Sequence, residues 1–342
     1  QIRLEIQMGT FDPEAHFKRS TPGPKDRKIR DLVLERMERK RKLKGAKGWS
    51  ESTYSERKKL FDKHLDPNFG HLTLPDLTAN HVRNWVSKQT FSLNRGQLVM
   101  SLLNPVVKEA LADGTLSRHP YEHVQLSEYL SQPTLRQRRE RIDPLSEEEV
   151  FLVLDAAADP QIRNYLQFMI FSGLRMQEGP VVRWDDVNWH DRTLTVSRAV
   201  GMANNQEYLK TTKTEDERTI ELTTPAWEAI QNQRKFTQLE GGYIFKPPLS
   251  SNAPKYEWIS RTRIRSIWMR ALKRAGVRAT NRSPKQTRHT FCSLMIAAGK
   301  SLTWVAQQAG HASLSMLEQH YAQSVRLAAN QHQEYDFGQA LI

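Results

Sequence analysis

Apolar residues recur at the spacing of one helical face along most of this 342-residue chain. The first such pattern covers 26–47, where one side is apolar, the rest is rich in Lys and Arg, and glycines end the segment. The stretch before it differs, because alternate apolar residues predict a strand from Ile2 to Met8. One strand cannot fold alone. We therefore expect 1–25 to be the remnant of a small N-terminal domain, followed by a basic helical linker over 26–48.

The segment 49–124 is predicted to be all helical. Its first helix is expected to begin at a cap formed by Ser50 or Ser52 and to end before a turn at 67–70, where the sequence is Pro-Asn-Phe-Gly. The longest apolar pattern in this segment predicts a helix over 93–111. These helices are long enough together to form one domain.

A polar, Arg-rich stretch over 125–142 predicts a linker between two domains. The second domain is expected to begin at residue 143 and to open with a capping box formed by Ser146 and Glu149. Further along, three strands are predicted at Thr193–Arg198, Glu207–Thr211 and Arg218–Leu222. The fold is thus predicted to be mainly α with a small antiparallel β-sheet, in a helical domain followed by an α+β domain.

The charge of the chain indicates a polyanionic partner. Lys and Arg number 51 against 38 Asp and Glu, which gives a net charge of +13 and favours DNA, RNA or an anionic membrane surface. Two basic clusters flank the helical segment. They are Arg39, Lys40, Arg41 and Lys42 on one side, and Arg136, Arg138, Arg139 and Arg141 on the other. Their placement favours a clamp that follows a phosphate backbone.

Other features exclude several classes of protein. No apolar run approaches the ~18 residues that a membrane span needs, and the N-terminus lacks the pattern of a signal peptide. Cys292 is the only cysteine, so no intrachain disulfide is possible, and the spacing of the histidines indicates no zinc site. We therefore expect a cytoplasmic protein that binds neither a membrane nor a metal.

Four clusters in the second domain carry residues suited to one kind of chemistry. They are Gly173-Leu174-Arg175 with Glu178, the turn lysine Lys213, the pair Lys285 and Arg288 with His289, and Gly310-His311 with Tyr321 ten residues after the histidine. Taken singly, each is typical of an ordinary helix start, turn or buried tyrosine. Together they supply guanidinium groups that bind non-bridging phosphate oxygens, as metal ions do in other enzymes. The tyrosine adds an oxygen nucleophile, whose pKa of about 10 means that it needs help to lose its proton.

The order of these motifs resembles the catalytic domain of the tyrosine recombinases, the phage integrase family. It reads Gly-Leu-Arg-x-x-Glu, Lys-Thr, Lys-x-x-Arg-His-Thr-Phe, Gly-His and Tyr, and it covers roughly 143–325. The segment 49–124 resembles the SAM-like core-binding domain of that family. The sequence Gly-Thr-Phe-Asp-Pro at 9–13 resembles the end of the arm-binding domain of integrases from phages and integrative mobile elements. The remaining 326–342 would be a C-terminal tail.

The resemblance implies a nucleophile and its phosphate ligands. Tyr321 would attack the scissile phosphate and become a 3′-phosphotyrosine. Arg175 and Arg288 would hold the non-bridging oxygens, and His311 would add a hydrogen bond to the same phosphate. The ten-residue spacing from His311 to Tyr321 exceeds the commoner nine by one residue, which the preceding turn could absorb.

The resemblance also implies how protons move. Lys213 would protonate the departing 5′ oxygen as general acid, with Lys210 as a weaker candidate for the same role. Glu178 and His289 would support the site. Lys285 stands where the family usually has a histidine. Either its pKa falls beside two arginines, so that it can accept the tyrosine proton, or it only binds phosphate.

The activity so implied is site-specific DNA recombination that integrates or excises a mobile element, with no cofactor, no ATP and no obligatory metal. The expected partners are double-stranded DNA at attachment or core sites, further copies of the chain in a homotetramer on that DNA, and accessory DNA-bending or directionality factors. The expected location is the bacterial cytoplasm, in association with the nucleoid. Two alternatives stay open: an architectural or regulatory DNA-binding protein of the same fold, and a relaxase of the type IB topoisomerase kind.

Overall fold

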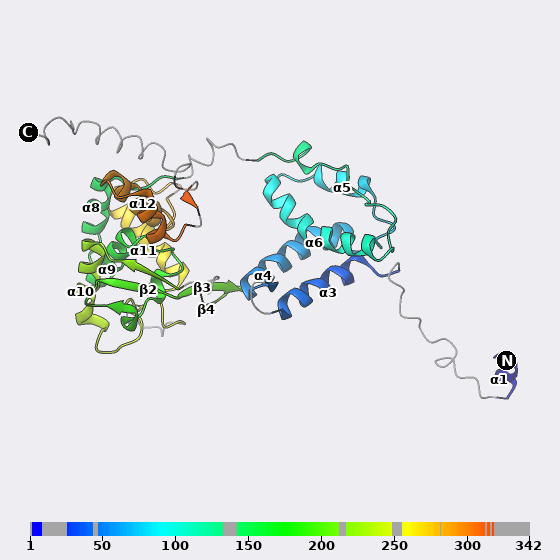
Figure 1. Cartoon of the computed structure of the whole chain (residues 1–342), viewed down its shortest axis with the longest axis horizontal. Coiled ribbons are helices and arrows are strands. Elements are labelled where there is room, and N and C mark those ends of the chain that lie inside the picture. Colours follow the sequence, from blue (N-terminus) through cyan, green and yellow to red (C-terminus); the bar gives the residue numbers. More distant parts are fainter. Residues whose placement is uncertain are drawn as a thin grey trace, which may run out of the picture. The chain divides into compact units, whose positions relative to one another are not determined.

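The computed structural model describes residues 2–8, 26–43, 47–132, 142–211, 217–247, 255–280, 282–311, 313, 314 and 317. The chain forms two compact units, an N-terminal unit of residues 1–133 and a C-terminal unit of residues 134–342 (Figure 1). The fold is mainly α with small antiparallel sheets, as the sequence predicts. Among the described residues, no helix is long and apolar enough to cross a membrane.

The N-terminal unit packs helices around its own core. They are α3 (Ile29–Lys42), α4 (Glu51–Leu60), α5 (Ala79–Val86) and α6 (Leu93–Ala112), with a short 3-10 helix η3 (Leu126–Glu128) after them. Ser50 caps α4 by accepting a hydrogen bond from the backbone N–H of Thr53. The helix expected over 93–111 is confirmed as α6.

Two expectations for this unit are wrong. No turn ends the helix at 67–70, because the chain continues from α4 as a π-helix, η2 (Phe61–Gly70). Phe61, Leu65 and Phe69 lie four residues apart and are all buried, so the core keeps this stretch helical, and the wider π-helical turn leaves room for the ring of Pro67. The strand predicted near the N-terminus is instead a short helix, α1 (Ile2–Gln7). A helix pairs its own backbone groups, which an isolated strand cannot do.

The helices described in the C-terminal unit pack around a large core, to which α8 to α11 contribute, and a smaller one formed by α12 and α13. They are α8 (Glu147–Asp155), α9 (Pro160–Phe171), α10 (Thr224–Thr237), α11 (Arg261–Arg274), α12 (Gln286–Ala297) and α13 (Leu302–Ala309). The predicted capping box is confirmed, because Glu149 N–H donates to Ser146 Oγ at 3.2 Å and Ser146 N–H donates to Glu149 Oε2 at 2.9 Å. Arg282 then binds Glu149 at 2.7 Å, which ties α8 to the segment before α12.

The strands form two sheets rather than the single sheet expected from the sequence. Three strands, β1 (Val187–Asn188), β2 (Thr193–Val196) and β5 (Arg218–Glu221), pair antiparallel in that order. The other two, β3 (Arg198–Ala203) and β4 (Gln206–Thr211), form a separate hairpin. The sequence did not predict β3. It pairs with β4 because Asn204 and Asn205 both adopt positive φ, as a tight two-residue hairpin turn requires.

Candidate active site

Arg175 lies in a turn just after α9, and Gly173 sets the path of that turn. Gly173 has φ of +69°, and a Cβ at this position would lie 2.6 Å from the ring of Phe291 on α12. Only glycine therefore allows the end of α9 to approach α12 so closely. Glu178 closes the turn, because its carboxylate accepts hydrogen bonds from the backbone N–H and the Nη1 of Arg175, both at 2.9 Å.

The Glu178 carboxylate also binds a second arginine. Arg218, the first residue of β5, donates from Nη1 at 3.0 Å and from Nη2 at 2.6 Å. Glu178 is only 2% exposed. Burial alone would raise its pKa, but the hydrogen bonds and positive charges of Arg218 and Arg175 outweigh burial and lower the pKa below its ordinary value. One ionised carboxylate thus holds two guanidinium groups in place.

Two backbone carbonyls bring the other predicted residues to the same place. Arg288 Nη1 donates to the carbonyl of Gly173 at 3.0 Å, and Arg175 Nη2 donates to the carbonyl of Gly310. Gly310 ends α13 with φ of +65°, and a Cβ there would lie 3.0 Å from Arg218 Nε. The next residue is His311, whose backbone N–H donates to Ala306 at 2.9 Å. The structure therefore gathers Arg175, Arg288 and His311 around Glu178.

The charges of this cluster do not balance. Three guanidinium groups, of Arg175, Arg218 and Arg288, lie around one carboxylate, so the cluster carries a net charge of +2. Burial, and to a smaller extent the charge of Arg175, lower the pKa of Arg288 to about 10, which leaves it protonated at neutral pH. Arginines held close together without enough counter-charge favour a bound anion, and a phosphate matches their planar donors.

Two further residues from the motifs, one predicted to be catalytic and one supporting, lie at the start of α12. Lys285 occupies the N-cap position of α12 and is exposed. No carboxylate of the described residues forms an ion pair with it. His289 follows Arg288 and is half-buried. Lys210, the weaker candidate for general acid, lies in β4. Lys213 and Tyr321 lie outside the described residues.

Sequence reasoning missed Arg218 as a member of the cluster. The sequence marks it only as the residue that opens a predicted strand, and its partner Glu178 lies 40 residues earlier. No signal in the sequence marks this pairing, because the burial that leads the carboxylate to acquire a second donor is visible only in the structure.

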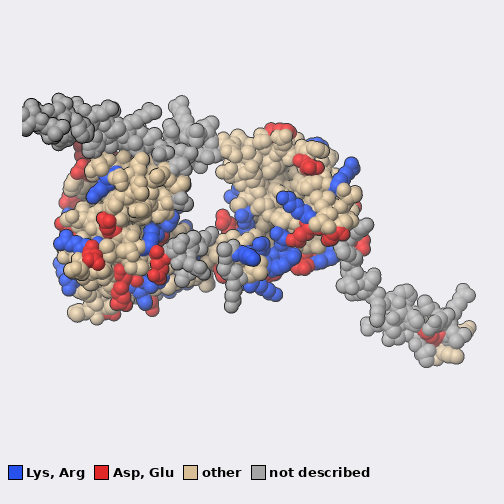
Figure 2. Space-filling model, viewed as in Figure 1, with Lys and Arg blue, Asp and Glu red and all other residues tan. Residues whose placement is uncertain are grey.

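The basic residues predicted to bind DNA are partly paired within the chain. Arg39 and Arg41, in the last turn of α3, form ion pairs with Glu109 at 3.5 Å and Glu51 at 3.0 Å respectively. Lys40 donates to a backbone carbonyl, while Lys42 is exposed and has no ion-pair partner within the described part of the chain. Figure 2 shows Lys and Arg interspersed with Asp and Glu on the face of this unit that it presents. The cluster formed by Arg136, Arg138, Arg139 and Arg141 lies outside the described residues.

Comparison with protein-family models identifies both parts of the chain. Residues 143–326 match the model of the phage integrase family, and residues 44–89 match the phage integrase N-terminal SAM-like domain. IntQ of Escherichia coli K12 is 28% identical over 242 residues, which cover 65% of this chain and 58% of IntQ. Prophage integrase IntR of the same organism is 29% identical over 241 residues, which cover 65% of this chain and 55% of IntR. The chain thus spans less than two thirds of the length of these two relatives.

A solved structure shares the fold of both units. The Tn1549 transposon integrase, in complex with a circular intermediate DNA, aligns with a TM-score of 0.70 and 16% identity. The alignment covers 90% of this chain and 99% of the other.

The lowered pKa of Glu178 generates a prediction about stability. A carboxylate whose pKa is lower in the folded state stabilises fully above its unfolded pKa, about 4.3, and loses that contribution as the pH falls through the folded value. Glu178→Gln should therefore reduce the free energy of unfolding at pH 7 by about 2 kcal/mol. The difference from wild type should shrink as the pH falls below about 4.

Urea denaturation at a series of pH values measures this effect. Glu148→Gln is the matched control, because Glu148 is exposed on α8, and it should lower the stability by less than about 1 kcal/mol, the loss of a favourable charge at a helix N-terminus. A difference between Glu178→Gln and wild type that persists unchanged at acidic pH would contradict the role of the ionised carboxylate.

Proposed function

Since the chain belongs to the phage integrase family, we propose that it is a site-specific DNA recombinase that cleaves and rejoins DNA through a 3′-phosphotyrosine at Tyr321. It would integrate or excise a mobile element. The observation that carries this proposal is the arginine cluster around Glu178, where Arg175 and Arg288 lie beside His311 with positive charge in excess.

The cluster supports phosphoryl transfer in particular. As a nucleophile attacks a phosphodiester, negative charge grows on the non-bridging oxygens, and donors already in place stabilise it without reorganisation. Glu178 and the carbonyls of Gly173 and Gly310 fix the arginines before any DNA binds. The binding of a phosphate would relieve their mutual repulsion, so affinity and catalysis draw on the same charges.

In the proposed reaction, the oxygen of Tyr321 forms a bond to phosphorus and the bond to the 5′ oxygen breaks. Lys213 donates a proton to that leaving oxygen. The phosphotyrosine keeps the energy of the original phosphodiester, and the 5′ hydroxyl of another strand can attack it and release the tyrosine. Tyr321 follows His311 by ten residues and Lys213 precedes Arg218 by five, so both are close in sequence to residues of the cluster.

Double-stranded DNA is the proposed partner of both units. The relative of known structure was solved with DNA, and the net charge of +13 supports contacts with many phosphates. In the N-terminal unit, Lys42 is the most available of the basic residues on α3, since Arg39 and Arg41 already bind carboxylates. Accessory DNA-bending or directionality factors would assist recombination. The reaction would take place in the bacterial cytoplasm, at the nucleoid.

An architectural DNA-binding protein is the second candidate. The relative IntQ is described as a defective protein. This chain departs from its family at Lys285. Such a protein would bind the same DNA without cleaving it. A relaxase of the type IB topoisomerase kind would instead relax supercoiled DNA of any sequence. The assay that follows separates cleavage from binding alone, and relaxation of supercoiled DNA that lacks the recombination site would identify the relaxase.

A nicked suicide substrate tests the nucleophile. The wild-type protein should form a covalent adduct with DNA that survives denaturing gel electrophoresis. The short fragment between the cleavage site and the nick, which carries the 5′ hydroxyl, diffuses away before it can rejoin. Tyr321→Phe should form none. Tyr335→Phe, which changes another tyrosine of the C-terminal region, should form as much as wild type. The absence of an adduct with the wild-type protein on its own site would contradict the recombinase proposal.

The position of Lys285 favours a contact with phosphate over the removal of the tyrosine proton. It is exposed at the N-terminus of α12, three residues before Arg288, where backbone N–H groups also attract anions. Lys285→Gln should then slow cleavage by about 10-fold, the effect of one lost charge-assisted hydrogen bond, with no change in the shape of the pH–rate profile. Lys285→His tests the other role, since histidine titrates near pH 6.5. A profile displaced to lower pH in this variant would identify Lys285 as the general base.

An apolar groove on the C-terminal unit supports assembly of a homotetramer. The groove, of about 900 Å³, lies among α8, α9 and α12, and its residues Phe151 and Leu152 are 66% and 53% exposed. The last residues of the sequence include Phe337, Leu341 and Ile342. We propose that the C-terminal tail of one copy binds the groove of a neighbouring copy.

Removal of the tail tests this arrangement. Deletion of 330–342 should weaken the pairing of two DNA sites more than the binding of one site, as measured by native gel electrophoresis. Phe151→Ser should have the same selective effect, because it makes the groove polar. Equal losses in both measurements would count against the proposal.

A further inference from the structure

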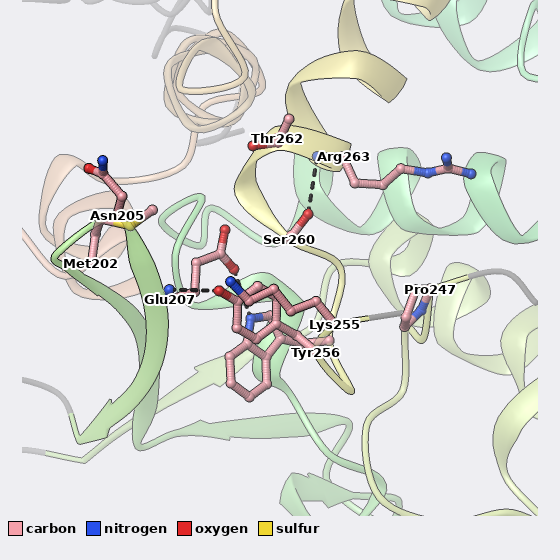
Figure 3. Close-up of a pocket in the computed structure, with 10 residues that line it drawn as sticks. Met202, Asn205, Glu207, Pro247, Lys255, Tyr256, Ser260, Thr262 and Arg263 are labelled. Atoms are coloured by element: carbon pink, nitrogen blue, oxygen red, sulfur yellow. Dashed lines mark hydrogen bonds between the residues drawn. The ribbon is translucent and has the colours of Figure 1, made fainter. Parts of the chain in front are cut away.

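The tip of the β3–β4 hairpin is held by one carboxylate that none of the catalytic motifs contains. Glu207, the second residue of β4, accepts hydrogen bonds from Trp258 Nε1 at 3.0 Å and from the backbone N–H of Arg261 at 2.8 Å. In return, the backbone N–H of Glu207 donates to the hydroxyl of Tyr256 at 3.0 Å. We call Glu207, Tyr256, Trp258 and Arg261 the Glu207 clamp. Figure 3 shows Glu207 and Tyr256 meeting at its centre.

The residues of the clamp outside the hairpin are themselves held by α11 and by aromatic packing. Arg261 is the first residue of α11, so the Glu207 carboxylate satisfies a free N–H at the positive end of a helix. The ring of Trp258 stacks on Tyr256 at 5.2 Å and meets the edge of Tyr243 at 6.0 Å. Through Tyr243 it joins a small apolar cluster that includes Val200 of β3. Both strands of the hairpin therefore have a contact with this region.

The hairpin needs such an anchor because it lies outside the other sheet. A two-stranded hairpin is marginally stable by itself, and β3 and β4 pair only with each other. Beside the clamp is a cavity of about 390 Å³, lined by Met202 and Asn205 of the hairpin and by Thr262 of α11 (Figure 3). Close packing thus does not fix the tip, and the directed bonds of Glu207 do so instead.

The middle of strand β3 lies beside the arginine cluster. Val200 N–H donates to the carbonyl of Gln177 at 2.8 Å, directly beside Glu178. From Glu207 in the clamp, strand β4 runs four residues on to Thr211, which lies two residues before Lys213 in the sequence. The chain next enters β5 at Arg218, which binds Glu178. At about 3.3 Å per residue, β4 acts as a lever of roughly 13 Å from Glu207 to Thr211, the last residue of the strand.

We propose that Glu207 is a positioning residue for DNA cleavage, which fixes the direction of β4 and thereby the delivery of Lys213 to the leaving 5′ oxygen. This inference rests on the proposed function, in which Lys213 is the general acid. General-acid catalysis depends on hydrogen-bond reach between the donor and the leaving atom. A tilt of the lever at its clamped end would displace that donor while leaving the arginines around Glu178 in place.

A substrate with sulfur at the 5′ bridging position provides the test. When Tyr321 attacks it, the new bond from tyrosine oxygen to phosphorus replaces the bond from phosphorus to sulfur, and the sulfur leaves as a thiolate that needs no proton. Loss or displacement of the general acid should therefore slow cleavage of the oxygen substrate and spare the sulfur substrate. A general distortion of the active site would slow both.

The variants separate the clamp from its surroundings. Glu207→Ala should slow cleavage of the oxygen substrate by at least about 10-fold, within the range that general acid–base catalysis contributes, and should cleave the sulfur substrate at nearly the wild-type rate. Glu207→Gln keeps one acceptor oxygen but presents an amide N–H to the second donor, so it should recover part of the rate. Trp258→Phe removes only one donor and should show a smaller defect with the same rescue, which serves if Glu207→Ala folds poorly. Glu257→Ala is the matched control, because Glu257 lies between Tyr256 and Trp258 but is exposed and outside the clamp.

Lys213→Ala, measured in parallel, distinguishes the two proposals. If sulfur rescues Lys213→Ala but not Glu207→Ala, the positioning role is overturned while the general acid stands. A wild-type rate for Glu207→Ala on the oxygen substrate also overturns the positioning role. If sulfur fails to rescue Lys213→Ala, the assignment of the general acid fails, and the inference about Glu207 fails with it.

Discussion

The arrangement of the C-terminal unit depends on one buried carboxylate that two arginines share. Glu178 binds Arg175 within its own turn and Arg218 at the start of β5, so it joins the end of α9 to the central sheet. Burial of an unpaired carboxylate is costly, so Glu178 can be buried only where both guanidinium groups reach it. Arg175 extends the connection to Gly310 at the end of α13. Three elements distant in sequence thus take their relative positions from one ion.

The same bonds that order the cluster leave it with too little negative charge. Glu178 satisfies two arginines, whereas Arg288 is held through the carbonyl of Gly173 and gains no carboxylate of its own among the described residues. Burial therefore lowers the pKa of Arg288 to about 10. Stability and function oppose each other here, because a second carboxylate would relieve the repulsion and would also occupy the place that suits a phosphate. A site organised in advance accepts that cost so that nothing must reorganise when charge develops.

Local patterns in the sequence predicted the contacts between residues that are close together in the chain. The capping box of Ser146 and Glu149 and the bond from Arg175 to Glu178 each span three residues, and both are present. The pairing of Glu178 with Arg218 spans 40 residues and depends on how the sheet turns, so no local pattern encodes it. The missed strand β3 and the π-helix through Pro67 have the same origin, because pairing and burial overrode local preference. The position of Tyr321 and Lys213 rests on the sequence motifs alone.

Two carboxylates, of Glu178 and Glu207, fix the positions of different groups in this unit. Glu178 is almost wholly buried and fixes arginines, while Glu207 lies at the rim of a cavity and fixes a hairpin. The two are connected, since β3 binds Gln177 beside Glu178 and pairs with the strand that carries Glu207. Apolar packing brings these elements together but has no preferred direction. Hydrogen bonds do have a preferred direction. Where a cavity leaves the packing loose, as at the tip of the hairpin, hydrogen bonds set the angle at which the strand approaches the site.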